Sequence, residues 1–158
     1  MSEIRYFTWL SQAIPKGNAA VNAILEKYDS AKRFYEDFNK DPKTIDFLTP
    51  NIKKGLEKTD ISQADEILNR CERLGIKTVC CTDEEFPHKL TEIYGVPPVL
   101  YYVGDISVLN GGPAISVVGT RKPLDKSKQI TGSICRDLTS IGITVISGCA
   151  VGIDEYAH

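Results

Sequence analysis

The sequence predicts an α/β protein in two parts, a helical N-terminal half followed by the first part of a doubly wound parallel sheet. Three observations support this class. Apolar residues recur at helical spacing from about residue 6 to 75, short β-branched runs replace that pattern afterwards, and one long amphipathic segment separates the last two runs. We therefore expect one domain over residues 1–75 and a second over residues 76–158.

The helical half is predicted from apolar positions three and four residues apart, which place side chains on one helix face. Breaks are expected at Pro15–Asn18 and at Asp41-Pro42. For the last helix, Ser62 is the predicted N-cap, Asp65 completes a capping box and Gly75 ends the helix. The expected core positions are Phe7, Leu10 and Ile14, then Ala20, Val21, Ile24, Leu25 and Tyr28, and then Phe34, Tyr35 and Phe38.

Four strands are predicted in the second half, in the runs "IKTVCC", "VLYYVG", "AISVVG" and "ITVISG". Between the last two, apolar residues at helical spacing from Ile130 to Ile141 predict a helix, so this part forms a βαβ unit. Near-continuous apolar strands are typical of a parallel sheet buried on both faces. Since the chain ends as a further helix begins, we expect it to be part of a longer protein. Its free sheet edge then favours self-association, or disorder near residues 147–158.

Composition excludes several classes of protein. The chain is 42% apolar and 25% charged with a net charge of −2, so it is not a polycation, and any nucleic-acid binding must come from a local patch. No segment is typical of a signal peptide or a membrane span, which favours a cytoplasmic protein. Five cysteines without a C-x-x-C pair, beside two histidines, predict free and mostly buried thiols and no metal site.

Two loops follow predicted parallel strands, and ligands bind at the carboxyl ends of such strands. Glycines allow close approach of a phosphate, and helix N-termini present unpaired N–H groups to it. The first loop and the helix after it also carry four cations between residues 121 and 128, against Asp125 alone. The sequence therefore predicts a phosphate-binding or DNA-binding site made by Gly119, Thr120, Arg121, Lys122, Lys126, Lys128, Ser147, Gly148 and Gly152.

Other interpretations remain open at this point. The basic loop is also compatible with a plain βα turn with a solvated face, because neither G-x-G-x-x-G nor a P-loop is present. Asp154 and His158 lie four residues apart, but a helix-start carboxylate and a packed histidine are favoured over a catalytic pair. The aromatic residues Tyr6, Phe7 and Trp9 are favoured as core over a platform for base stacking.

A resemblance becomes specific at "DEEFPHKLTEIYGVPPVLYYVGD", "AISVVGTRKP" and "SGCAVGIDEYAH". Together these blocks resemble the DNA-processing protein A family (DprA, also called Smf). The resemblance implies a sterile-alpha-motif-like (SAM-like) N-terminal domain followed by an extended Rossmann-like domain. It also implies a non-enzymatic recombination mediator without a cofactor, which binds and protects single-stranded DNA in natural transformation, helps load the RecA recombinase and forms a homodimer when full-length.

The motif positions imply that Gly119, Thr120 and Arg121 form the phosphate-binding turn and that Lys122 adds charge. The resemblance likewise implies that Ser147, Gly148, Gly152 and Asp154 build the loop beside it. The chain departs from the family pattern at Leu124, Lys126 and Ser127, where a hydroxyl residue and a Tyr-Gly pair are common. It departs again at Val151, where a basic residue is frequent.

Two further alternatives come from other classes of protein. One is a nucleotide-binding Rossmann-like enzyme of the phosphoribohydrolase type, although its P-G-G-x-G-T-x-x-E signature does not occur in the sequence. The other is a protein-interaction module that uses the helical half. The turn "IPKGNAAVNAIL" also resembles a helix-hairpin-helix turn, which can hold DNA phosphates, but Ala20 or a neighbour replaces the usual second glycine.

Overall fold

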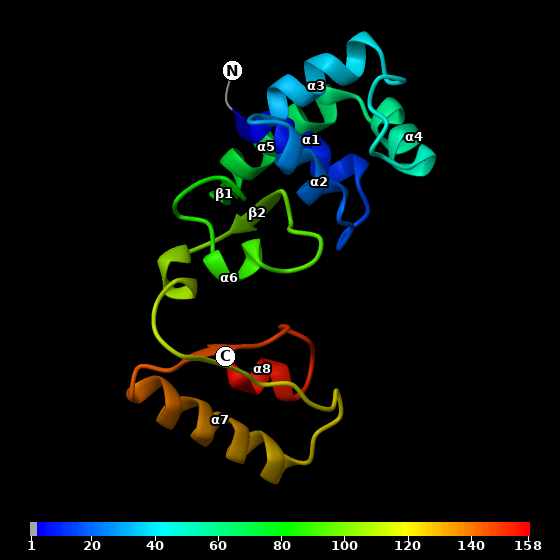
Figure 1. Ribbon diagram of the computed structural model, residues 1–158. Helices are drawn as coiled ribbons and strands as arrows, with labels where there is room; N and C mark the ends of the chain where they lie inside the picture. The colour runs from blue at the N-terminus through cyan, green and yellow to red at the C-terminus, as the bar shows by residue number, and fades with distance from the viewer. Residues whose placement is uncertain (1–2) are drawn as a thin grey trace. The chain divides into compact units, whose positions relative to one another are not determined.

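The computed structural model describes residues 3–158, which form two compact units (Figure 1). Unit 1 extends to Ile106, and unit 2 comprises Ser107–His158. The first two strands after Gly75 belong to unit 1. Both pack against the helix Glu3–Ala13, and the first also packs against the helix Ile61–Arg73. The predicted division into domains at residues 75 and 76 stays a prediction.

Unit 1 begins with five helices, and side-chain caps explain where several of them start. The Ser30 hydroxyl accepts a hydrogen bond from the backbone N–H of Arg33 at 3.1 Å, and Thr49 caps the fourth helix in the same way. Such caps satisfy N–H groups that have no partner within the helix. The helices are α1 (Glu3–Ala13), α2 (Ala20–Lys27), α3 (Ala31–Lys40), α4 (Pro50–Lys58) and α5 (Ile61–Arg73).

Two details of the predicted helices are wrong. Helix α5 begins at Ile61, and its N-cap is Asp60, which accepts the N–H of Ser62 at 2.8 Å; this hydrogen bond lowers the pKa of Asp60. Asp65 is therefore not in a capping box but pairs with the Arg5 guanidinium of α1 at 2.6 Å. Helix α4 was not expected, although Thr49 before Pro50 is a start signal for it.

The core of unit 1 forms around α1, which packs against α3, α4 and α5. Phe7 and Trp9 are each 1% exposed, and the indole Nε1 of Trp9 donates a hydrogen bond to the Thr59 carbonyl at 2.7 Å. The Trp9 ring meets the edge of Tyr35 with centroids 4.9 Å apart. These contacts confirm that Tyr6, Phe7 and Trp9 are core residues.

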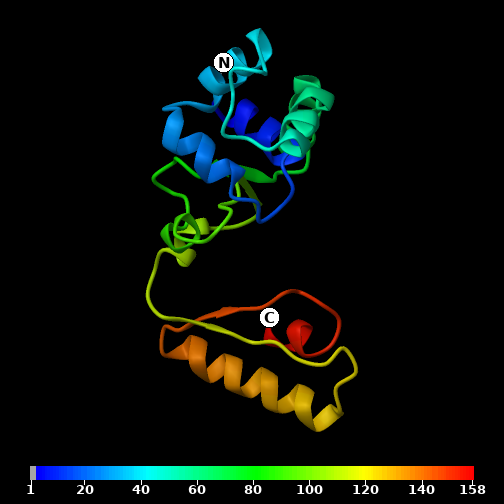
Figure 2. The ribbon, with the colours of Figure 1, turned by 45° about the vertical axis from the view of Figure 1, so that its right-hand side comes forward.

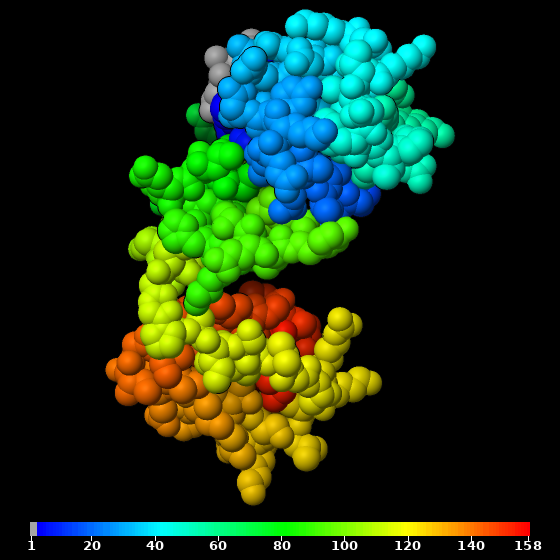
Figure 3. All heavy atoms as spheres, in the orientation of Figure 1, coloured from blue at the N-terminus to red at the C-terminus, as the bar shows by residue number. Residues whose placement is uncertain are grey.

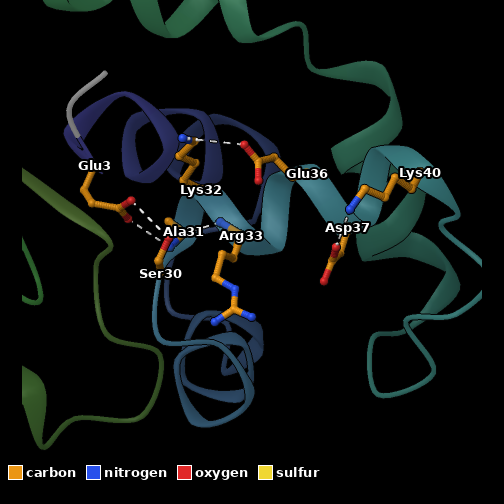
Figure 4. A network of polar contacts seen from close by, with 8 residues as sticks. All are labelled: Glu3, Ser30, Ala31, Lys32, Arg33, Glu36, Asp37 and Lys40. Atoms are coloured by element: carbon orange, nitrogen blue, oxygen red, sulfur yellow. Dashed lines mark hydrogen bonds and ion pairs between the residues drawn. The ribbon is translucent and has the colours of Figure 1, made fainter.

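Polar contacts fix the start of α3 against α1 (Figure 4). The Glu3 carboxylate accepts hydrogen bonds from the Ser30 hydroxyl at 3.1 Å and from the backbone N–H of Ala31 at 2.9 Å. A carboxylate is favoured here because the N-terminus of a helix carries partial positive charge. Ion pairs on the surface of α3, such as Lys32–Glu36, are exposed and contribute little to stability.

Unit 1 also holds an antiparallel pair of strands, β1 (Lys77–Cys80) and β2 (Val99–Tyr102), with Lys77 opposite Tyr102. The expectation that these strands continue one parallel sheet with the later two is therefore wrong. Their connection contains the short α6 (His88–Thr91), and the chain returns to β1 in the opposite direction. The pair packs on α1.

Unit 2 contains the predicted βαβ unit, with β3 (Ala114–Ser116) parallel to β4 (Thr144–Ile146). Helix α7 (Asp125–Ser140) connects them and lies along the strand pair in both ribbon views (Figures 1 and 2). Gly142 has φ +81° and lets the chain turn from α7 into β4. The short α8 (Ile153–Ala157) follows β4, and the 3₁₀ helix η1 (Ile106–Leu109) spans the boundary between the units.

The strands of unit 2 are not buried on both faces, contrary to the prediction. Ile115 is 44% exposed and Ile146 is 42% exposed. Among the described residues of this unit, Cys135 and Ala157 are the buried apolar side chains. The two strands are paired only with each other, so little of their apolar surface is covered.

Candidate functional site

The two loops predicted to form a site lie together in unit 2. The Ser147 hydroxyl donates to the Val117 carbonyl at 2.8 Å, and the Val117 N–H donates to Ile146 at 2.9 Å. Further on, the backbone N–H of Ile153 donates to the Thr120 carbonyl at 3.1 Å. The loop after β3 and the loop after β4 are therefore joined along their length, as the carboxyl ends of neighbouring parallel strands allow.

Asp154 is the residue that holds the loops to one another. It is buried in the first turn of α8, and its carboxylate accepts the Gly119 N–H at 3.3 Å and the Gly148 N–H at 3.2 Å. Hydrogen bonds to a charged acceptor are the stronger ones. The two N–H groups expected to face a phosphate thus face Asp154, and the phosphate-binding role of Gly119 and Gly148 stays a prediction.

The glycines of both loops allow close contact between them. A Cβ on Gly119 would lie 2.6 Å from the Cβ of Ile153, and one on Gly148 would lie 2.9 Å from an Asp154 carboxylate oxygen. Gly152 is buried at φ +105°, and a Cβ there would overlap the Thr120 carbonyl and lie 2.7 Å from the Cα of Arg121. Space therefore favours glycine at Gly119 and Gly152, and at Gly152 the backbone conformation favours it as well; at Gly148 a Cβ would require the Asp154 carboxylate to shift.

The cations of the first loop face solvent. Arg121, Lys122 and Lys126 are exposed, and none of them makes an ion pair with any residue from 3 to 158. The Lys122 backbone N–H donates to the Thr120 hydroxyl at 3.1 Å, which fixes the turn that carries Arg121. Figure 3 shows the segment around residue 120, in yellow, extending side chains from the surface of unit 2.

Lys128 differs from the other three cations. Its ammonium pairs with Asp125 at 2.8 Å, one turn back on α7, and lies 5.6 Å from the Tyr156 ring centroid. The hydrogen bond with Lys128 lowers the pKa of Asp125, and the same bond raises the pKa of Lys128. Its charge is partly neutralised within the protein, so it attracts an external anion less than Arg121 does.

The residues considered for catalysis are not arranged for it. Asp154 is engaged by the two loops, and the His158 Nε2 atom lies 3.3 Å from the Cys149 sulfur instead. Cys149 is exposed and has φ +53°, an unusual conformation for a residue with a side chain. The favoured interpretation of Asp154 as a helix-start carboxylate agrees with its place in α8. The expectation of a packed histidine is wrong, because His158 is exposed.

The cysteines differ in how far they are buried. All five are free; Cys71, Cys80 and Cys135 are buried. Burial raises the pKa of the Cys80 thiol and raises that of Cys81 to about 12. Over the described residues, no group of three or more His, Cys, Asp or Glu side chains could hold a metal ion. No helix in residues 3–158 is both long enough and apolar enough to cross a membrane.

Comparison with known proteins relates the second half of the chain to one family. The family described as DNA recombination-mediator protein A matches residues 77–158. The DNA processing protein DprA of Bacillus subtilis is 32% identical over 111 residues, which cover 68% of this chain and 37% of that protein. The chain thus spans little more than a third of the length of this relative.

Two solved structures are also similar. The X-ray structure of DprA from Streptococcus pneumoniae covers 100% of this chain, which spans 53% of it, with a TM-score of 0.64 and 18% identity. That likeness shows a shared fold. A structure of DNA processing protein A from Helicobacter pylori, described for its single-stranded DNA binding mode, is 33% identical over 52% of this chain and 36% of its own, with a TM-score of 0.42.

Proposed function

Because this chain belongs to the DNA recombination-mediator protein A family, we propose that it binds single-stranded DNA through the loop after β3. The observation that supports this proposal is a pair of exposed cations, Arg121 and Lys122. They lie on a turn that is held in place because the Asp154 carboxylate accepts the N–H of Gly119. An anchored loop with cations free of ion pairs presents positive charge at a fixed place. Lys126, one turn into α7, extends that charge.

The chemistry of the loop suits backbone phosphates rather than bases. A guanidinium donates two parallel hydrogen bonds to a phosphate, and an ammonium adds charge. Contacts of this kind position DNA without reading its sequence, and their strength falls as salt rises. We therefore propose binding with little sequence preference and a strong dependence on salt concentration.

Further parts of the proposal concern the longer protein to which the family resemblance points. We propose that it shields DNA taken up in natural transformation, hands that DNA to the RecA recombinase, forms a homodimer and works in the cytoplasm. A role without catalytic turnover is supported by Asp154, whose carboxylate is engaged by the two loops rather than paired with His158.

Fluorescence anisotropy of a labelled poly-dT oligonucleotide tests the proposal at two salt concentrations. Arg121→Ala should weaken binding by ~1–3 kcal/mol, because one charged hydrogen-bonding group is lost, and should lower the salt slope by about one phosphate contact. Arg121→Lys keeps the positive charge but cannot donate two parallel hydrogen bonds to one phosphate, so it should keep only part of the affinity.

Lys54→Ala is the matched control, since it removes one exposed positive charge from α4 in unit 1. It should leave the affinity unchanged. A duplex of equal length should bind more weakly than the single strand. If Arg121→Ala binds as well as the parent chain, the loop after β3 is not the binding site.

A further inference from the structure

Unit 1 contains a cavity that the proposed site does not use. It has a volume of about 710 Å³ and lies between the turn that joins α1 to α2 and the segment that leads into β2. These two segments lie side by side in both ribbon views (Figures 1 and 2). The residues that shape its chemistry are Gln12, Lys16, Asn18, Tyr94, Tyr101 and Pro98.

The cavity is built by tight backbone contacts. Gly95, at φ +74°, lies so close to Gly17 that a Cβ would overlap the Gly17 carbonyl and lie 2.7 Å from the Asn18 nitrogen. The side-chain oxygen of Asn22 accepts the Val96 N–H at 3.1 Å. The segment before β2 is thus held against the α1–α2 turn, and the cavity exists without a ligand to shape it.

Its lining combines aromatic rings with a single charge. Tyr94 is 80% exposed and Tyr101 is 40% exposed, although each ring could bury a large apolar area. The Tyr101 hydroxyl reaches the Ser11 hydroxyl at 3.5 Å, which limits where that ring can turn. Lys16 is the one charged residue among the lining residues, and none of them is a carboxylate.

We infer that this tyrosine pocket, defined by Lys16, Tyr94 and Tyr101, binds a nucleotide of single-stranded DNA. A base stacks on the exposed tyrosine rings, while Lys16 holds the phosphate beside it. Aromatic side chains stack on any base, and cations along the path bind the backbone. The amides of Gln12 and Asn18 offer hydrogen bonds to base edges.

The charge of the lining favours a nucleotide over a peptide. An apolar or proline-rich peptide also suits aromatic grooves, but it does not require an unpaired cation or an absence of carboxylates. A nucleotide joins a flat apolar ring to an anion, which matches both features of the lining. The inference rests on the proposed function, since DNA is the ligand, but it assigns a second contact on different residues.

Photocrosslinking locates the contact directly. The full chain is irradiated with a dT oligonucleotide that carries 5-iodo-deoxyuridine, and the linked peptides are identified by mass spectrometry. Crosslinks at Tyr94 or Tyr101 are the expected result. Tyr94→Ala should weaken binding of the oligonucleotide about five-fold or more, whereas Tyr94→Phe, which keeps the ring, should match the parent.

Val103→Ala is the control, since Val103 is 79% exposed and lies outside the cavity lining. Circular dichroism confirms that each variant is folded, as expected for such exposed positions. Lys16→Glu should weaken binding more than Tyr94→Ala at low salt, because it replaces the attraction for a phosphate with repulsion.

The outcomes separate this inference from the proposed function. Crosslinks confined to residues 119–152, with Tyr94→Ala binding like the parent, would overturn the tyrosine pocket and leave DNA binding intact. A loss with Tyr94→Ala but none with Arg121→Ala would support the pocket and reject the loop. A proline-rich peptide that fills the cavity without reducing DNA affinity would also overturn the inference.

Discussion

The two units of this chain differ in how far their large apolar side chains are buried. In unit 1, large residues such as Trp9, Phe34 and Leu56 are at most 2% exposed. Of the fifteen exposed large apolar residues between residues 3 and 158, ten belong to unit 2, among them Val118 at 77% and Leu124 at 76%. Unit 1 is therefore stabilised by a packed core, whereas unit 2 depends more on hydrogen bonds and leaves apolar surface available for contact.

This difference shows which contacts hold the basic loop, the loop after β3, in a fixed position. The basic loop belongs to the poorly packed unit, yet Asp154, Ser147 and Gly152 fix it through contacts to its backbone. A binding loop needs only its own backbone held in place, and polar contacts can do this without a large core.

The largest expected effect tests the core of unit 1. Phe34→Ala removes a fully buried ring and should lower the free energy of unfolding by about 3–5 kcal/mol. The matched change in unit 2, Ile134→Ala, trims a side chain that is 51% exposed and should cost below about 1 kcal/mol. Urea unfolding measures both changes: the fluorescence of Trp9, the one tryptophan, reports unit 1, and hydrogen exchange over residues 107–158 reports unit 2. Equal shifts for both variants would contradict the comparison.

A smaller effect is expected where the two loops of unit 2 touch. Gly152→Ala places a methyl group against the Thr120 and Arg121 backbone and should cost about 2–3 kcal/mol. Gly142→Ala has a positive φ as well, but nothing lies within 4 Å of its Cβ, so strain alone should cost about 1 kcal/mol. Hydrogen exchange over residues 107–158 measures both. Identical protection in the two variants would mean that the loops do not depend on this contact.

The third effect separates charge from shape at the centre of unit 2. Asp154→Asn keeps the size of the side chain but turns one acceptor into a donor, which faces the N–H of Gly119 or Gly148. The cost should be about 1–2 kcal/mol, seen as faster exchange at those two amides. Glu155→Gln, an exposed neighbour, is the control. Slower exchange in Asp154→Asn would show that the carboxylate does not hold the loops.

The smallest expected effect is a change in how the stability of unit 1 depends on pH. The Arg5 guanidinium lowers the pKa of Asp65 below its ordinary value of 3.8, so the pair stabilises the folded state above about pH 4. That contribution disappears as pH falls through the lowered pKa. Asp65→Asn should therefore flatten the acid side of the stability curve measured by urea unfolding, while the exposed Asp46→Asn should not. If the stability curve of Asp65→Asn falls at low pH as steeply as that of the parent, other groups cause the loss of stability in acid.

Much of the fold could be predicted because local patterns decided it. Helical spacing located the core faces of α1 and α3, and the run from Ile130 to Ile141 located α7. The antiparallel pairing of β1 with β2 was missed, since strand direction depends on the path of the connection rather than on the strands. The cap of α5 was misplaced because Asp60 and Ser62, two polar residues separated only by Ile61, both suit that role.

The candidate site was predicted only in part. Strand ends and glycines indicated that the loops after β3 and β4 would meet, and the structure brings them together. The hydrogen bonds of Asp154 to both loops were not expected, because the bond to Gly119 joins residues 35 apart in sequence. The tyrosine pocket could not be predicted from the sequence either, because Lys16, Tyr94 and Tyr101 lie in separate segments that share no sequence pattern.

The hydrogen bond from Gly119 to Asp154 also sets an order of events during synthesis. The basic loop leaves the ribosome 35 residues before the carboxylate that anchors it. At ~5–20 residues per second, the loop spends about 2–7 seconds without its anchor. Unit 1 already has its full sequence by then and can fold first. The surface proposed to bind DNA is therefore completed after unit 1, once Asp154 has left the ribosome.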